Sequence, residues 1–252
     1  MQSVLQDTYK KHHKKINHFV TYFDDLGEQF GIADRNTIKL FDLDGETINV
    51  KSFKVPNIVN QIAYKFLRKS KAQRSFEYAS KLKTLNIGTP KPIAYYEYTT
   101  PFLFKKSFYV SEHLECDLTY RELTRNLEYP EHEIILRAFT RFTYKLHQNN
   151  INFLDHSPGN TLIKKVGADY QFFLVDLNRM EFKPMDFETR IKNFARLTIH
   201  KSMIETMSDE YAKISGEDYT KTFNLMWQLT ESFQEKFHRK KRLKKKLEFW
   251  KK

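Results

Sequence analysis

The chain has 252 residues and a formal net charge of +12, and its 40% hydrophobic residues include 22 Phe and 14 Tyr. This length and composition allow a packed core in one large domain or two small lobes. Its one cysteine, Cys116, excludes an internal disulfide, and no window approaches the roughly 18 apolar residues of a membrane span. The N-terminus lacks a signal-like apolar stretch, so we expect a cytoplasmic protein, soluble or peripherally bound.

The first part of the chain is predicted to be rich in strands. Residues 3–23 are expected to form a polar, basic helix or a loosely ordered arm. Polar and apolar residues alternate over 36–43 and 46–53, with the turn signal Asp44-Gly45 between them, which predicts a β-hairpin. The next elements expected are a helical segment over 57–86 ending at Gly88, then strands over 93–98 and 108–111.

The second part is predicted to be mainly helical. The spacing of apolar residues predicts helices over 121–126 and 131–148, strands over 161–164 and 172–175, and helices after Pro184. The fold class is therefore α+β. The expected parts are a strand-rich lobe of residues 1–113, a helical lobe of residues 114–232, and a basic tail of residues 233–252.

Three residues in the helical lobe have the order that a phosphoryl-transfer site requires. Asp155 is followed five residues later by Asn160, and Asp176 ends the next predicted strand pair. A carboxylate can orient an acceptor hydroxyl, while an amide and a second carboxylate can hold Mg²⁺. The spacing of Asp155 and Asn160 alone is a weak signal, because an Asp at such a turn is more often a simple cap.

Residues of the strand-rich lobe strengthen the hypothesis. A nucleotide-binding kinase lobe needs a lysine on a strand and a glutamate on the following helix. Lys51 lies within the alternating run, whereas its rival Lys54 lies near Pro56, where the strand ends; we favour Lys51. Glu77 is the candidate partner, although a lone helical Glu is more often solvated.

These segments resemble bacterial lipopolysaccharide core kinases, the Kdo and heptose kinases of the protein-kinase-like superfamily. The resemblance covers about residues 36–200, and its segments are Asn49–Phe53, the helix around Glu77, Gly88–Pro92, Leu146–Asn160 and Val175–Asn178. It implies a two-lobed protein-kinase-like fold and a phosphotransferase with an alcohol group as acceptor.

The resemblance also implies roles for the matching residues. Lys51 would contact the α- and β-phosphates of ATP, with Glu77 orienting it. Asp155 would act on the acceptor hydroxyl, and Asn160 and Asp176 would hold Mg²⁺. Backbone groups of the hinge segment would bind adenine, and its residues are Glu112, His113 and Leu114.

The chain departs from protein kinases at several positions. No Gly-x-Gly-x-x-Gly is present, and Ala33-Asp34-Arg35-Asn36 is the expected turn over the phosphates. Phe153 replaces the His of His-Arg-Asp, and Asp176-Leu177-Asn178 replaces Asp-Phe-Gly, which leaves a pseudokinase open. Helix resumes at about Asp186, so the segment after Asp176 is short and favours a small-molecule or sugar acceptor over a peptide.

The tail carries much of the charge. Residues 235–252 contain ten Lys or Arg against two Glu, a balance of +8, which leaves +4 for the other 234 residues. On a helix, five apolar residues of the tail fall within an arc of about 140°: Phe233, Phe237, Leu243, Leu247 and Trp250. This pattern suits an anionic membrane surface, and the alternative is a stripe that packs on the helical lobe. Nucleic acid is not expected as a partner, because no recognition motif accompanies the charge.

The leading hypothesis is an ATP- and Mg²⁺-dependent kinase of a sugar hydroxyl in lipopolysaccharide core, on Kdo or heptose linked to lipid A. Its expected place is the inner face of the cytoplasmic membrane. Two alternatives stay open, namely a kinase of another small molecule or of protein, and a non-catalytic membrane-associated scaffold.

Overall fold

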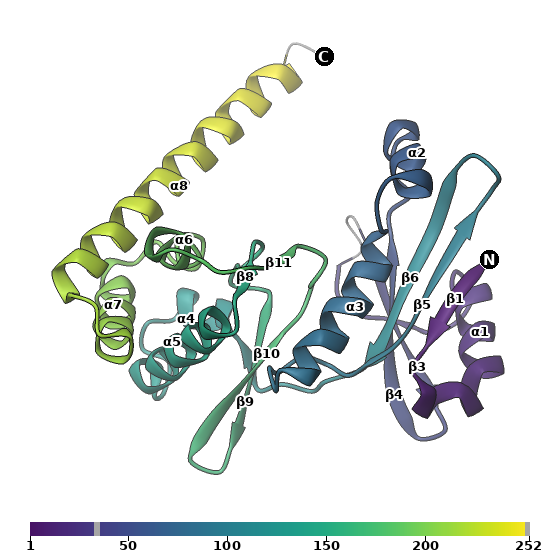
Figure 1. Cartoon of the computed structure of the whole chain (residues 1–252), viewed down its shortest axis with the longest axis horizontal. Coiled ribbons are helices and arrows are strands. Elements are labelled where there is room, and N and C mark those ends of the chain that lie inside the picture. The colour runs from purple at the N-terminus through teal and green to yellow at the C-terminus, as the bar shows by residue number, and fades with distance from the viewer. Residues whose placement is uncertain (33–35, 250–252) are drawn as a thin grey trace. The chain divides into compact units, whose positions relative to one another are not determined.

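The computed structural model describes residues 1–32 and 36–249, with side chains to Lys245, and it contains two compact units (Figure 1). Unit 1 comprises Met1–Glu115 and Leu174–Arg179, and unit 2 comprises Cys116–Phe173 and Met180–Lys252. The chain therefore leaves unit 2 at Leu174, contributes six residues to unit 1, and returns. None of the helices in the described part of the chain has the length and apolar character needed to cross a bilayer.

Unit 1 is built on a six-stranded antiparallel sheet with the order β1-β5-β6-β4-β3-β2. Its strands are β1 (Gln2–Leu5), β2 (Glu28–Gln29), β3 (Asn36–Leu43), β4 (Glu46–Phe53), β5 (Pro92–Thr99) and β6 (Phe104–Glu112). Its helices are the 3-10 helix η1 (Asp7–His12), α1 (His13–Thr21), α2 (Ile58–Phe66) and α3 (Lys71–Thr84).

The predicted hairpin is confirmed as β3 and β4, which pair from Asn36↔Phe53 to Leu43↔Glu46. Asp44 and Gly45 connect them with φ of 57° and 90°. Two successive residues with positive φ form the tight turn that matches the twist of the strands.

Helices cover both faces of this sheet. The alternation of β4 sends Ile48 and Val50 toward one face, where they pack with Ile16 and Phe19 of α1. Phe53 points to the other face and packs with Phe76 of α3. Lys51 shares the parity of Phe53 and therefore lies on the α3 face.

Two predictions for unit 1 differ from the structure. They concern the N-terminal segment and the length of the helix expected after the hairpin. Of the two alternatives for residues 3–23, a helix is present as η1 and α1, but it is not wholly polar, because Tyr9, Ile16 and Val20 are buried against the sheet. The helical segment expected over 57–86 is two helices, α2 and α3. The break falls at Ser70, whose Oγ accepts a hydrogen bond from the Gln73 N–H and caps α3.

Unit 2 is mainly helical. Its helices are α4 (Tyr120–Arg125), α5 (His132–Gln148), α6 (Phe187–Lys192), α7 (Lys201–Ser215) and α8 (Tyr219–Phe249). Its short strands are β7 (Leu118–Thr119), β8 (Ile151–Phe153), β9 (Thr161–Val166), β10 (Asp169–Leu174, ending in unit 1) and β11 (Met180–Phe182). The core lies between α5, α7 and the start of α8, with Phe139, Tyr211 and Met226 fully buried.

The strands around the catalytic-loop candidate were partly predicted. The strands expected over 161–164 and 172–175 are present as β9 and β10, in the sheet β10-β9-β7. The pair β8 and β11 was not predicted, because each strand has only three residues, too few to show a period. This pair positions Phe153, immediately before the loop that carries Asp155.

Candidate active site

In unit 1, Lys51 contacts Asp176 directly. Lys51 Nζ lies 2.6 Å from Asp176 Oδ1, and the two side chains are 14% and 30% exposed. The ammonium group also lies 5.3 Å from the centre of the Phe53 ring. The rival Lys54 follows the end of β4 and is exposed. Lys51 is therefore the lysine that reaches the carboxylate of the candidate metal ligand.

The segment carrying Asp176 is anchored to unit 1 by hydrogen bonds. The Leu174 N–H donates to the Gly88 carbonyl over 2.9 Å, and the Thr89 hydroxyl donates to the Leu174 carbonyl over 2.9 Å. Asp176 has a φ of 57°, an uncommon conformation for a residue with a Cβ. Asn178 Nδ2 donates to Asp176 Oδ1 over 2.8 Å. The carboxylate is thus fixed by its backbone, an amide and a lysine.

Glu77 lies on α3, as expected, but its contacts are not those predicted. Its carboxylate binds Lys69 Nζ at 2.7 Å and Gln73 Nε2 at 2.9 Å. Among the described residues, Lys51 therefore pairs with Asp176, and Glu77 pairs with Lys69. The role of Glu77 in orienting Lys51 stays a prediction.

The hinge candidate is the end of β6 and the residues after it. The Glu112 N–H donates to the Lys91 carbonyl, and the His113 N–H donates to the Thr47 carbonyl. The Tyr9 hydroxyl donates to Glu112 Oε1 over 2.7 Å, and burial together with this carboxylate raises the pKa of Tyr9. Since these two N–H groups are already bonded, adenine would have to use other backbone groups of the segment, at Leu114 or the carbonyls.

In unit 2, Asp155 and Asn160 lie on one loop and are hydrogen-bonded to each other. Asn160 Nδ2 donates to the Asp155 carbonyl over 2.8 Å, and the Asn160 N–H donates to the Ser157 carbonyl over 2.9 Å. The Asn160 Nδ2 is the donor in this bond. The atom of the Asn160 amide that could bind a metal ion is Oδ1, a hard oxygen.

Asp155 is held by an arginine that the sequence did not indicate. Arg196 Nη1 lies 2.6 Å from Asp155 Oδ1 and 3.1 Å from the Leu154 carbonyl. The guanidinium group lies over the Phe233 ring of α8, 5.5 Å from its centre. Arg196 follows Asp155 by 41 positions and belongs to no motif, so only the folded chain reveals the contact.

The base of the loop is buried and aromatic. His156 is 1% exposed, and its ring lies 5.3 Å from Phe139 and 5.5 Å from Phe153. Neither ring nitrogen has a hydrogen-bond partner among the described residues. Burial, with a smaller effect of Arg196, lowers the pKa of His156 to about 3. Phe153, unexplained in the sequence, is therefore part of an aromatic support beneath Asp155.

The candidate metal ligands suit a hard cation. Asp176 and Asn160 offer carboxylate and amide oxygens, which Mg²⁺ takes together with waters and phosphate oxygens. In the described part of the chain, no three His, Cys, Asp or Glu side chains cluster as a protein-only metal site. Asp176 belongs to unit 1 and Asn160 to unit 2, and their joint role as metal ligands stays a prediction.

Residues 46–223 match the lipopolysaccharide kinase (Kdo/WaaP) family, which is well over half of the chain. The matched range contains Lys51, Glu77, Asp155, Asn160 and Asp176. The chain belongs to this family. The family is one of phosphotransferases acting on sugar hydroxyls, so this member is a lipopolysaccharide kinase, and nucleotide use is implied.

The fold of this family member is similar to that of a solved structure, WaaP in complex with acyl carrier protein. The TM-score is 0.65 with 16% sequence identity, and the match covers 95% of this chain and 99% of that one. At this identity the likeness shows the fold alone. The predicted family resemblance and the predicted protein-kinase-like fold are both confirmed. No curated protein matches the chain.

One further contact of this kinase was not predicted, and one predicted turn lies partly outside the described residues. Asn178 was noted as the end of Asp176-Leu177-Asn178, but its bond to Asp176 was not foreseen; its proximity in sequence was the available signal. The turn expected over the phosphates, Ala33-Asp34-Arg35-Asn36, includes residues 33–35, which lie outside the described residues.

Proposed function

We propose that this kinase uses ATP and Mg²⁺ to phosphorylate a sugar hydroxyl of lipopolysaccharide core, on Kdo or heptose linked to lipid A. The observation that carries the proposal is the 2.6 Å contact between Lys51 Nζ and Asp176 Oδ1. It pairs a strand lysine, suited to phosphate oxygens, with a carboxylate suited to Mg²⁺.

Each residue has a definite part in the proposed reaction. The acceptor oxygen attacks the γ-phosphorus, the bond to the β–γ bridging oxygen breaks, and ADP leaves. Asp155 orients the hydroxyl and takes its proton. Lys51 binds the α- and β-phosphates, while Asp176 and Asn160 hold Mg²⁺, which when bound neutralises charge on the phosphates. Glu77 supports Lys51, and the segment Glu112–Leu114 binds adenine.

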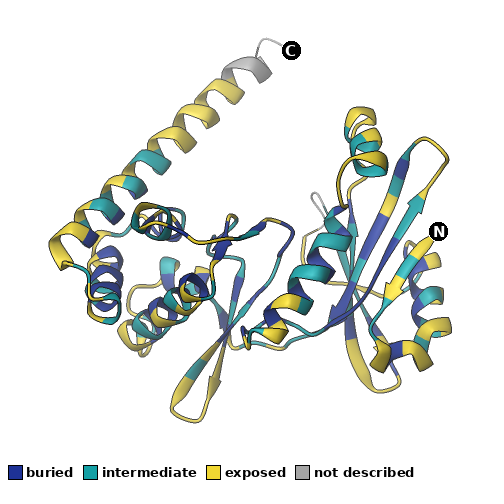
Figure 2. Cartoon of the chain, viewed as in Figure 1, coloured by how far each residue is buried: buried dark blue, intermediate teal, exposed yellow. Residues whose placement is uncertain are grey.

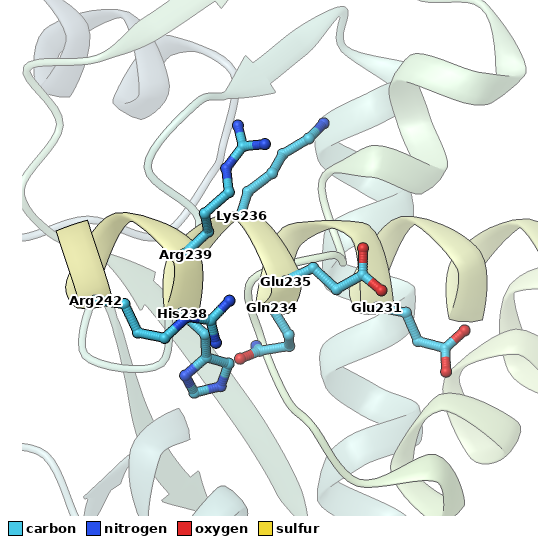
Figure 3. Close-up of a pocket in the computed structure, with 7 residues that line it drawn as sticks. All are labelled: Glu231, Gln234, Glu235, Lys236, His238, Arg239 and Arg242. Atoms are coloured by element: carbon cyan, nitrogen blue, oxygen red, sulfur yellow. The ribbon is translucent and has the colours of Figure 1, made fainter.

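The basic end of α8 supports a position at the inner face of the cytoplasmic membrane. Residues 235–245 are all exposed, and Phe237 and Leu243 are among them (Figure 2). Lys236 and Arg239 project from one side of α8, and His238 and Arg242 project from the other (Figure 3). Each basic residue near an anionic surface contributes about 1 kcal/mol. Of the predicted stripe, Phe233 instead packs on Arg196, and the side chains of Leu247 and Trp250 lie outside those described.

The test is transfer of labelled γ-phosphate to purified core acceptors. Asp155→Ala, Asp176→Ala and Lys51→Ala should each lower the rate by at least about 100-fold, because each removes a group that acts in the transition state. Lys54→Ala and Asp169→Ala, which remove exposed charges of the same kinds, should keep nearly full activity. Equal activity in all five variants would refute the site, and a larger loss from Lys54→Ala than from Lys51→Ala would exchange the two lysines.

Three further measurements separate the proposed function from its two alternatives. Mass spectrometry of lipopolysaccharide from a deletion strain should show the loss of one phosphate. Intact phosphorylation there, with transfer to another small molecule or a protein in an acceptor screen, would favour the first alternative. Absence of Mg²⁺-dependent ATP binding by calorimetry would favour the non-catalytic scaffold.

A further inference from the structure

Helix α2 has its apolar side turned outward. At 100° per residue, Ile58, Ile62, Phe66 and Val59 fall within an arc of about 100°. All four are exposed, with Val59 at 71% and Phe66 at 60%, and no residue of α2 is buried. A helix on the surface of a globular domain normally packs such a stripe against the core. Here the stripe covers nothing in unit 1.

The polar and aromatic side of α2 attaches it to the sheet. The Tyr64 ring lies 5.5 Å from the Phe104 ring of β6, and Lys65 Nζ donates to Thr99 Oγ1 of β5 over 3.2 Å. The side chain of Asn57 caps the helix by accepting from the Asn60 N–H. The outward direction of the apolar stripe is therefore held by the Tyr64 contact on the opposite side of α2 and by the Lys65 contact at the edge of the stripe.

Other exposed apolar residues surround the stripe. Leu67 directly follows α2 and is 82% exposed, and Phe102 is 75% exposed in the connection between β5 and β6. Figure 1 shows α2 beside these two strands, at the end of unit 1 where they connect. We name Ile58, Val59, Ile62, Phe66 and Leu67 the α2 apolar face.

The segment that carries this face is basic and contains no acidic residue. Residues 54–74 contain six basic residues and no Asp or Glu: Lys54, Lys65, Arg68, Lys69, Lys71 and Arg74. Arg68 lies over the Tyr64 ring at 4.6 Å, on the side of α2 that packs on the sheet, and Lys69 pairs with Glu77 of α3. An occupant must therefore combine apolar depth with negative charge at its boundary.

We propose that the α2 apolar face is a membrane-docking surface that inserts into the boundary between headgroups and acyl chains of an anionic bilayer. Such a bilayer offers apolar depth beneath negative charge over a broad plane. A second copy of the chain fits poorly, because two segments of the same net charge would face each other. This surface belongs to unit 1, is separate from the basic end of α8, and does not depend on which sugar is phosphorylated.

Vesicle co-sedimentation of the full chain tests the proposal. We expect binding to vesicles of phosphatidylcholine and phosphatidylglycerol at 7:3, and weaker binding to pure phosphatidylcholine. Ile62→Gln with Phe66→Gln should weaken binding to the anionic vesicles about tenfold, since two inserted side chains are lost. The matched control, Ile134→Gln with Ile199→Gln, changes two side chains of unit 2 that are also exposed and apolar.

The α2 double variant should lose affinity whether or not residues Lys240, Lys241 and Arg242 of α8 are also changed to Glu. Unchanged affinity in the α2 variant, or an equal loss in the control pair, would overturn the proposal. Both double variants should transfer phosphate normally to an acceptor dispersed in detergent, which separates this test from that of the catalytic site.

Insertion can be observed directly with an environment-sensitive fluorophore. In a Cys116→Ser background, a label at Phe66→Cys should shift its emission to the blue when the anionic vesicles are added, whereas a label at Ile134→Cys should not. No shift at position 66 would contradict insertion. A shift produced by raising the protein concentration without vesicles would instead assign the face to a second copy or another protein surface.

Discussion

At the scale of single residues, the position of the Asp155 side chain is set by its contact with Arg196. Arg196 binds both the Asp155 carboxylate and the Leu154 carbonyl, so it fixes the side chain and the backbone of the loop together. The Phe233 ring supports the guanidinium group from α8. Arg196 is therefore a positioning residue, and its effect on catalysis acts through Asp155.

Replacing Arg196 with Met should lower kcat by about 10- to 100-fold, because small displacements of a catalytic group have effects of this size. The KM for Mg²⁺-ATP should change much less, since Arg196 contacts Asp155 rather than the residues proposed to bind nucleotide. Steady-state kinetics measure both values. Arg196→Lys should recover part of the rate, and Arg125→Met, at an exposed arginine ending α4, should behave as wild type. A large change in KM with kcat unaltered would contradict a positioning role.

The buried histidines make stability depend on pH. Burial lowers the pKa of both His156 and His147 to about 3, whereas an unfolded histidine has a pKa of about 6.5. Between these values the unfolded chain binds more protons, so the free energy of unfolding falls as the pH drops through this window. At pH 5 each histidine should account for a loss of about 2 kcal/mol relative to pH 8.

Urea denaturation of wild type and His156→Leu at pH 8, 6.5 and 5 measures this effect. Comparing the two proteins cancels the contribution of carboxylates, which also titrate in acid. The stability of His156→Leu should fall less between pH 8 and pH 5. Parallel losses in the two proteins would show that His156 does not contribute.

At the scale of elements, α2 and α3 show that the same spacing of apolar residues can give an exposed helix face or a buried one. In α3 the apolar positions Ala72, Phe76 and Leu82 are buried, whereas the corresponding stripe of α2 is exposed. The break at Ser70 allows the two helices to turn their apolar sides in different directions. Of these two helices, only α3 contributes buried residues to unit 1.

This difference should appear when the helix caps are removed. Ser70→Ala should lower the free energy of unfolding by about 1 kcal/mol, because it removes the acceptor of the Gln73 N–H at a buried helix start. Asn57→Ala removes the equivalent cap of α2, and should cost about 0.5 kcal/mol or less because α2 buries no residue. Denaturant titration of both variants tests the order, and a larger loss from Asn57→Ala would contradict it.

At the scale of the whole molecule, the chain assembles its candidate site from distant segments. The six residues from Leu174 to Arg179 belong to unit 1, although the strands before and after them belong largely to unit 2. This return brings Asp176 to Lys51, a partner 125 positions earlier in the chain. Asp155 and Asn160 remain with the helices of unit 2, where Arg196 and an aromatic base support them.

Much of this architecture was predictable because its signals are local. The hairpin of β3 and β4 was placed at its observed ends, because strict alternation and the Asp44-Gly45 turn act within a few residues. The short segments around Lys51, Glu77, Asp155, Asn160 and Asp176 pointed to the confirmed family, because each segment can be read locally although together they span much of the chain. The strands β8 and β11 escaped notice because three residues carry no measurable period.

The sequence by itself determined the fold class, the family and the residue types suited to phosphoryl transfer, since periodicity, turns and short motifs depend on neighbours along the chain. Tertiary structure decided which partner each charged side chain takes: Lys51 binds Asp176, Glu77 binds Lys69, and Arg196 holds Asp155. It also decided that the stripe of α2 faces outward while that of α3 faces inward. A period states that a helix has an apolar side, but the rest of the fold determines what that side meets.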